Sequence, residues 1–106
     1  MTRRIKETGT TNVLVDLGFA DAEELSAKTI LAKRLNEILA ARRLSQSKAA
    51  TLLGMPQPKV SAIRNYKLRG VSIERLMLAL TALGQNVEIT VRPCRRESAA
   101  RIKVAA

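Results

Sequence analysis

The sequence of 106 residues has no histidine, no tryptophan and one cysteine, Cys94. One cysteine cannot form an intrachain disulfide, and without histidine the Cys/His zinc sites and the catalytic arrangements built on imidazole are excluded. Asp16 and Asp21 are the only aspartates, and most glutamates are placed as exposed helix positions, so carboxylate catalysis is also poorly supported. We therefore expect a protein that is not an enzyme and that carries no metal and no cofactor.

Aromatic residues are almost absent, since Phe19 and Tyr66 are the whole set, although 46% of the chain is hydrophobic. A core built from Leu, Ile, Val and Ala is typical of a helical bundle. No apolar run approaches the roughly 18 residues of a membrane-spanning helix, and no signal-peptide stretch follows the basic N-terminus, so we expect a cytoplasmic protein with no membrane partner.

Acidic residues are scarce in the middle of the chain. The net charge is +10, and between Glu37 and Glu74 there is no acidic residue. That window carries seven basic residues: Arg42, Arg43, Lys48, Lys59, Arg64, Lys67 and Arg69. A small, strongly basic chain favours a polyanionic partner, and nucleic acid is the first candidate.

The first half of the chain predicts a basic arm and one long helix. Residues 1–11 are polar and basic, and we interpret them as a flexible arm. The apolar run 12–19 is compatible either with a short helical stretch that stops at Gly18 or with a strand. Asp21 and Glu24 have the spacing of a capping box, which predicts that a long helix begins there and runs to about residue 42.

The second half predicts three short helices. Ser45 suits the N-cap of a helix that runs to Leu53, and Gly54 suits the left-handed residue beyond its end. A second helix is expected over 57–66, with Val60 and Ile63 facing inward. Ser72 is expected to cap the third, which Gly84 ends.

Alternation of apolar and polar residues then predicts a short strand, with Val87, Ile89 and Val91 on one face, until Pro93 interrupts it. The expected fold is mainly α: a compact helical bundle with a helix-turn-helix and one short C-terminal β-strand. The domain is expected to span 12–92, with its motif at 45–66, and residues 93–106 are expected to form a basic flexible tail.

Residues 44–63 resemble the helix-turn-helix of the Cro and lambda-repressor type, the XRE family. Gln46 starts the first helix, Ala50 lies where two helices cross closely, Gly54 is the turn glycine and Gln57 opens the recognition helix. Pro56 departs from the pattern, because a Ser, Thr or Asp cap is usual there. This resemblance implies that the helix from Gln57 lies in the major groove of double-stranded operator DNA.

The same resemblance assigns the DNA contacts. The expected base-reading residues are Gln57, Pro58, Ser61 and Ala62, of which Gln57 can bond adenine through its amide. The expected phosphate contacts are Gln46, Lys59, Arg64, Asn65, Lys67 and Arg69.

From residue 12 to Pro93 the chain also resembles the HigA-like antitoxins of bacterial type II toxin-antitoxin systems. That resemblance implies a RelE/HigB-type ribonuclease toxin as partner and, in a dimer, repression of the protein's own operon. A strand without a clear partner in its own chain favours pairing with a second copy, and the alternative is pairing with residues 12–17. Two other functions remain open: a stand-alone regulator, and an RNA-binding or nucleoid-type protein, which the scarcity of aromatics disfavours.

Overall fold

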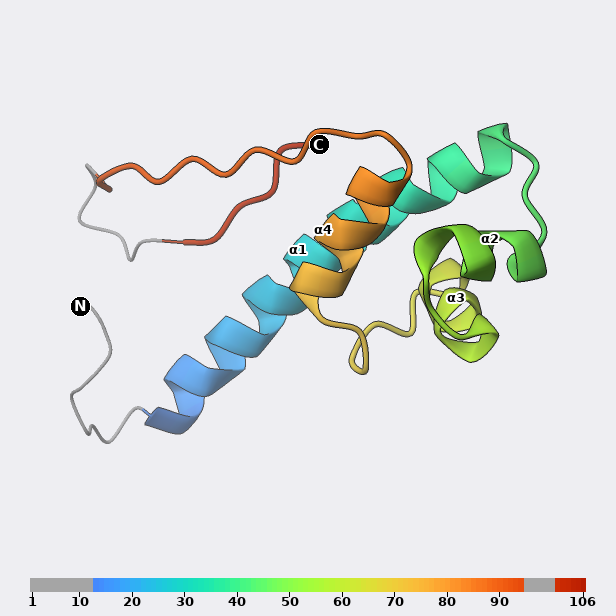
Figure 1. Cartoon of the computed structure of the whole chain (residues 1–106). Helices are drawn as coiled ribbons and strands as arrows, with labels where there is room; N and C mark the ends of the chain where they lie inside the picture. Colours follow the sequence, from blue (N-terminus) through green and yellow to red (C-terminus); the bar gives the residue numbers. More distant parts are fainter. Residues whose placement is uncertain (1–12, 95–100) are drawn as a thin grey trace.

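The computed structural model describes residues 13–94 and 101–106, with side-chain surroundings from residue 22 onward. Within these residues the chain forms four helices and no strand: α1 (Val13–Ala41), α2 (Gln46–Leu53), α3 (Gln57–Arg64) and α4 (Ile73–Ala82). Figure 1 shows α4 lying against the middle of α1, with α2 and α3 together beside the C-terminal half of α1. The mainly helical fold is confirmed. The arm expected over 1–11 lies outside the described residues.

The first helix settles the choice that the sequence left open over residues 12–17. Residues 13–17 are helical, and the helix continues through Gly18 and Asp21 without a break. The expectation that a helix begins at Asp21 is therefore wrong, as is Gly18 as a stop. Glycine and aspartate each cost a helix interior no more than about 1 kcal/mol relative to alanine, and α1 contains no proline to interrupt it.

The C-terminal end of α1 is held by main-chain and side-chain hydrogen bonds. Arg43 takes the left-handed conformation, with φ 55°, and the Leu44 amide donates to the Leu39 carbonyl at 3.2 Å. The Arg42 guanidinium donates to the carbonyl of Leu83 at 2.6 Å. Because Leu83 caps α4, this bond ties the ends of the two longest helices together.

The core is aliphatic, as the composition predicts. Its largest fully buried side chains come from α1, α3, α4 and the loops that join them: Leu35, Leu39, Val60, Ile63, Val71, Leu76 and Leu83. Burial of each such side chain contributes about 1.5–3 kcal/mol of hydrophobic stabilisation. The inward residues Val60 and Ile63 predicted for the second short helix are thus confirmed.

The strand predicted over 87–92 does not form within this chain. No backbone hydrogen bond joins residues 86–93 to another described residue, and the partner considered at residues 12–17 is excluded because residues 13–17 are helical. A β-strand is defined by backbone hydrogen bonds to a neighbouring strand, and the described residues of this chain provide no such neighbour for residues 87–92. The dimer strand, with Val87, Ile89 and Val91, stays a prediction for an assembly.

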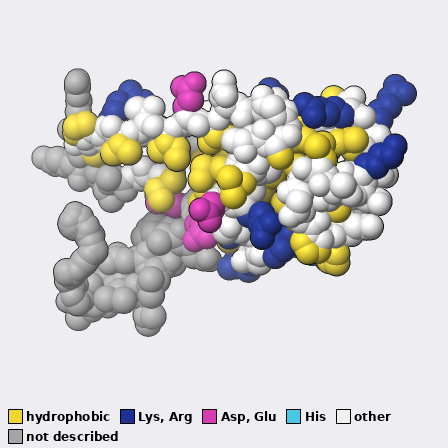
Figure 2. Space-filling model, in the orientation of Figure 1, with side chains coloured by type: hydrophobic (Ala, Val, Ile, Leu, Met, Phe, Trp, Pro, Cys, Tyr) yellow, Lys and Arg dark blue, Asp and Glu magenta, His cyan; other side chains and the backbone are white. Residues whose placement is uncertain are grey.

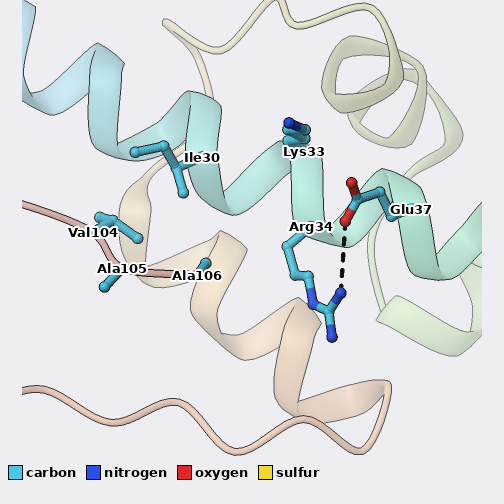
Figure 3. Close-up of a pocket in the computed structure, with 7 residues that line it drawn as sticks. All are labelled: Ile30, Lys33, Arg34, Glu37, Val104, Ala105 and Ala106. Carbon is cyan, nitrogen blue, oxygen red and sulfur yellow. Dashed lines mark ion pairs between the residues drawn. The ribbon is translucent and has the colours of Figure 1, made fainter.

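Part of the expected tail contacts the helical body. Val104 is half-buried against the core, and the Arg101 guanidinium lies 3.6 Å from the carboxylate of Glu23 on α1. Residues 104–106 also border a pocket of about 370 Å³ along α1, where Arg34 and Glu37 form an ion pair at 3.6 Å (Figure 3). No residue of α2 or α3 lines this pocket, so it is separate from the predicted DNA site.

None of the helices in the described part of the chain is long and apolar enough to cross a membrane.

Candidate DNA-binding surface

The turn between α2 and α3 has the geometry of a helix-turn-helix. The Ser45 hydroxyl accepts a hydrogen bond from the Lys48 amide at 3.1 Å and so caps α2. Gly54 follows the helix in the left-handed region at φ 66°, and the Met55 amide donates back to the Ala50 carbonyl at 3.1 Å. Such bonds satisfy the free carbonyls at a helix end and turn the chain sharply. Met55 is then buried, which fixes the start of the next helix.

The recognition helix begins at Gln57, as predicted, even though Pro56 cannot cap it with a side chain. Pro56 adopts the extended conformation of an N-cap residue, and its carbonyl accepts bonds from the amides of Lys59 and Val60. Pro58 lies in the first turn. Backbone N–H groups there have no acceptor within the helix, so a proline at this position costs no hydrogen bond. The helix ends at Arg64 instead of residue 66, because Tyr66 turns into the left-handed region at φ 58°.

The four expected base-reading residues share one side of α3. Positions 57, 58, 61 and 62 fall on the same face of a helix, opposite the buried Val60 and Ile63. Gln57 and Pro58 are exposed, whereas Ser61 and Ala62 are half-buried. The Asn65 amide donates to the Ser61 carbonyl at 2.9 Å and approaches its hydroxyl at 3.4 Å. Gln57 is therefore the most accessible hydrogen-bonding group on the face.

Several of the expected phosphate contacts make hydrogen bonds within the protein. Asn65 bonds to Ser61, as described above, and two cations bond to main-chain carbonyls. The Lys59 ammonium donates to the Gly70 carbonyl at 2.8 Å, and the Arg64 guanidinium donates to the Leu44 carbonyl at 2.7 Å. These bonds attach the recognition helix to the loop that follows it and to the turn that precedes α2. Lysine and arginine have further donors that can still reach an anion. Each of these two side chains, however, already uses one donor for a bond within the protein.

The other expected phosphate contacts lie at the edges of the motif. Gln46 is half-buried at the start of α2, and Asn65, Lys67 and Arg69 are exposed in the turn after α3. Lys67 has no side-chain hydrogen bond or ion pair to any described residue. Its ammonium is thus available for a phosphate oxygen.

Two residues of α1 that the sequence analysis did not select also hold the recognition helix and the loop that follows it. The Asn36 amide donates to the Ile63 carbonyl at 3.1 Å. The Lys28 ammonium, which is buried, donates to the Leu68 carbonyl at 3.1 Å and pairs with Glu24 at 3.1 Å. The sequence offers one signal for Lys28: it lies three residues after Leu25 and four before Ala32, so a lysine interrupts the apolar stripe of α1.

The charge around the motif is of one sign. On the face shown in Figure 2, Lys and Arg side chains lie around the edge of the part formed by α2 and α3, and the acidic side chains lie elsewhere. This agrees with the sequence window between Glu37 and Glu74, which lacks acidic residues. A surface of this kind attracts the phosphate backbone irrespective of base sequence.

A capped helix, a glycine turn and an exposed second helix inside a basic surface define a DNA-binding helix-turn-helix protein of the XRE type. The chain belongs to this family: the family model described as "Helix-turn-helix domain" matches residues 13–92. A solved structure named "Putative XRE Family Transcriptional Regulator" superposes with a TM-score of 0.74 at 56% identity, over 81% of this chain and 98% of that one.

Among curated proteins, "Putative antitoxin HigA2" of Mycobacterium tuberculosis is 36% identical over 63 residues. The match covers 59% of this chain and 62% of that protein, so the chain spans about three-fifths of the length of its relative.

Proposed function

We propose that this DNA-binding regulator is the antitoxin of a type II toxin-antitoxin pair, that it represses its own operon as a dimer, and that it neutralises a RelE/HigB-type ribonuclease. The observation that carries the proposal is the 36% identity to a protein named as an antitoxin. The chain also carries the exposed Gln57 on α3, in a stretch between Glu37 and Glu74 that has no acidic residue. The proposed role is one of binding alone, without a catalytic step.

Operator recognition is tested by binding to the DNA upstream of the gene, with scrambled DNA of equal length as the competitor, at two salt concentrations. We expect a preference for the upstream DNA that the double variant Gln57→Ala and Ser61→Ala removes, because each good base contact contributes about 1–3 kcal/mol of discrimination. The matched control is the double variant Thr29→Ala and Thr81→Ala, which changes two exposed, uncharged residues of α1 and α4. Equal, steeply salt-dependent binding to both DNAs would show a polycation without sequence preference.

Neutralisation is tested separately, by expressing a neighbouring gene for a small basic protein with and without this chain. Under the proposal that gene arrests growth alone, and growth returns when the chain is co-expressed. The Gln57 and Ser61 double variant should still restore growth, because the proposal assigns these residues to DNA only.

The second candidate is a stand-alone XRE-type regulator without a toxin partner. The observation that favours it is the match to nearly all of a structure named as a transcriptional regulator, at 56% identity. Operator binding together with a harmless neighbouring gene, and no toxin captured from the native host, would select this candidate.

A further inference from the structure

The chain leaves the helical body at a defined point and then runs extended. Gly84 takes a left-handed conformation at φ 81°, and the Gln85 amide donates to the Leu80 carbonyl at 3.0 Å. Residues 86–93 then have no backbone hydrogen bond to other described residues, and Figure 1 shows this segment running away from α4 as an extended trace. Its main-chain donors and acceptors are open to another strand.

The apolar face of this segment is anchored at one end and exposed at the other. Val87 packs against the core, whereas Ile89 is 73% exposed and Val91 is 90% exposed. In an extended chain these three side chains point to one side. Two exposed β-branched residues in succession on a strand edge are unfavourable in water and are typical of a pairing surface.

The opposite face carries two charges of opposite sign. Glu88 and Arg92 are both exposed, lie four residues apart with Thr90 between them, and have no ion-pair partner among the described residues. An antiparallel copy of the same segment can therefore be complementary to it, with each glutamate opposite the arginine of the other copy.

We propose that residues 86–93 pair antiparallel with the same segment of a second copy about a two-fold axis through Thr90. This inference rests on the dimer in the proposed function and specifies its register. Thr90 then faces Thr90 of the second copy, Ile89 faces Val91, and Glu88 faces Arg92. Symmetry repeats the apolar contact and the ion pair, so the interface contains two of each.

Pro93 fits this register. Residue pairs in an antiparallel ladder alternate between hydrogen-bonded and non-hydrogen-bonded. If the Thr90 pair is hydrogen-bonded, so is the Glu88–Arg92 pair, and Pro93 falls in a non-hydrogen-bonded pair opposite Val87. A proline at such a position removes no bond from the ladder.

Neighbouring registers lose the charge complementarity. With the axis through Ile89, Glu88 faces Thr90; with the axis through Val91, Arg92 faces Thr90. Axes through Glu88 or Arg92 place like charges directly opposite each other, which is destabilising. Only the axis through Thr90 brings each of the two charged side chains opposite its counter-ion.

A charge-exchange cycle measured by sedimentation equilibrium tests the register. Glu88→Arg and Arg92→Glu each create two pairs of like charges across the interface, and we expect the dimer dissociation constant to rise about tenfold or more. The double variant reverses both pairs and should return within about threefold of the starting value. Arg75→Glu, an exposed arginine on α4, is the matched control for a change in net charge.

Cysteine crosslinking provides a second readout that does not depend on charge. In a Cys94→Ser background, Thr90→Cys places two thiols opposite each other at the axis, where the Cα separation of about 5.5 Å suits a disulfide. Ile89→Cys and Val91→Cys place equivalent residues two positions apart, at about 7–8 Å. We expect rapid covalent dimer from Thr90→Cys alone.

The outcomes separate the register from the dimer itself. A dimer whose dissociation constant is unchanged by both single reversals, or fastest crosslinking at residue 89 or 91, would overturn the register and leave the proposed dimer intact. A chain that sediments as a monomer up to about 100 µM would overturn both. Weakening by each single reversal with recovery in the double variant establishes the register.

Discussion

Arg64 and Lys67 are both basic and three residues apart, but their side chains have different surroundings. The Arg64 guanidinium donates to the Leu44 carbonyl at 2.7 Å, while the exposed ammonium of Lys67 has no such partner among the described residues. The first side chain therefore stabilises the position of α3 within the protein, and the second is available to DNA. Sequence reasoning treated the two alike because the carbonyl that Arg64 contacts lies 20 residues away.

This difference predicts different responses of operator binding to salt. Lys67→Met should lower the slope of log affinity against log salt by about 0.9, the loss of one phosphate contact, and should leave the melting temperature unchanged. Arg64→Met should lower the stability by about 1.5–3 kcal/mol, the contribution of a charged hydrogen bond, with a smaller change in slope. Gel-shift titrations at several salt concentrations and thermal melts measure both quantities. An equal loss of slope in Arg64→Met with no loss of stability would place its cation on phosphate.

At the scale of the elements, the bounds of the short helices follow from local signals, whereas the contacts between helices depend on residues far apart in the sequence. Ser45, Gly54 and Ser72 sit within a few residues of the helix ends they define, so α2 and α4 were predicted closely. The start of α1 was not, because the spacing of Asp21 and Glu24 is equally compatible with the interior of a helix, where Glu24 pairs with Lys28 one turn later. The contact between Lys28 and Leu68 joins residues 40 apart, and no local pattern encodes such a distance.

The turn glycine gives a prediction at this scale. Gly54 has φ 66° and no atom within 4 Å of an added Cβ, whereas Gly70 has the same open surroundings without a positive φ. Gly54→Ala should therefore cost about 1–2 kcal/mol from backbone strain alone, and lower the melting temperature by roughly 4–8 °C per kcal/mol.

Gly70→Ala is the matched control and should change stability by less than about 1 kcal/mol. Circular dichroism melts of both variants make the comparison. Equal melting temperatures for the two would mean that the turn tolerates a left-handed alanine and that the glycine is not required by the motif.

At the scale of the whole molecule, a dimer would present two copies of α3 to DNA. Two-fold proteins of this kind read half-sites about one helical turn apart, on one face of the duplex. The base sequence of the operator is not encoded in any pattern of this chain that physical reasoning can read, but the spacing of its half-sites follows from the symmetry. The strand that would join the copies was predicted from alternation, and its pairing depends on a second chain that no local pattern describes.

Insertion of about five base pairs between the half-sites should rotate one of them to the opposite face of the duplex. We expect the affinity to fall to that of DNA with a single half-site, and an insertion of about ten base pairs to recover part of the loss. Gel shifts with the three DNAs and a half-site control make the measurement. Affinity that is indifferent to the insertions would indicate that each copy binds independently.

The extended segment after Gly84 also bears on the lifetime of the protein. Proteolytic nicking concentrates at exposed segments of this kind, and residues 86–93 offer such a segment whenever it is unpaired. The fully buried side chains of the core all lie between Ala32 and Leu83, so a cut here would leave the helix-turn-helix folded. Under the proposed dimer, dilution would expose this cleavage site, so the cell would lose paired protein fastest when its concentration is already falling.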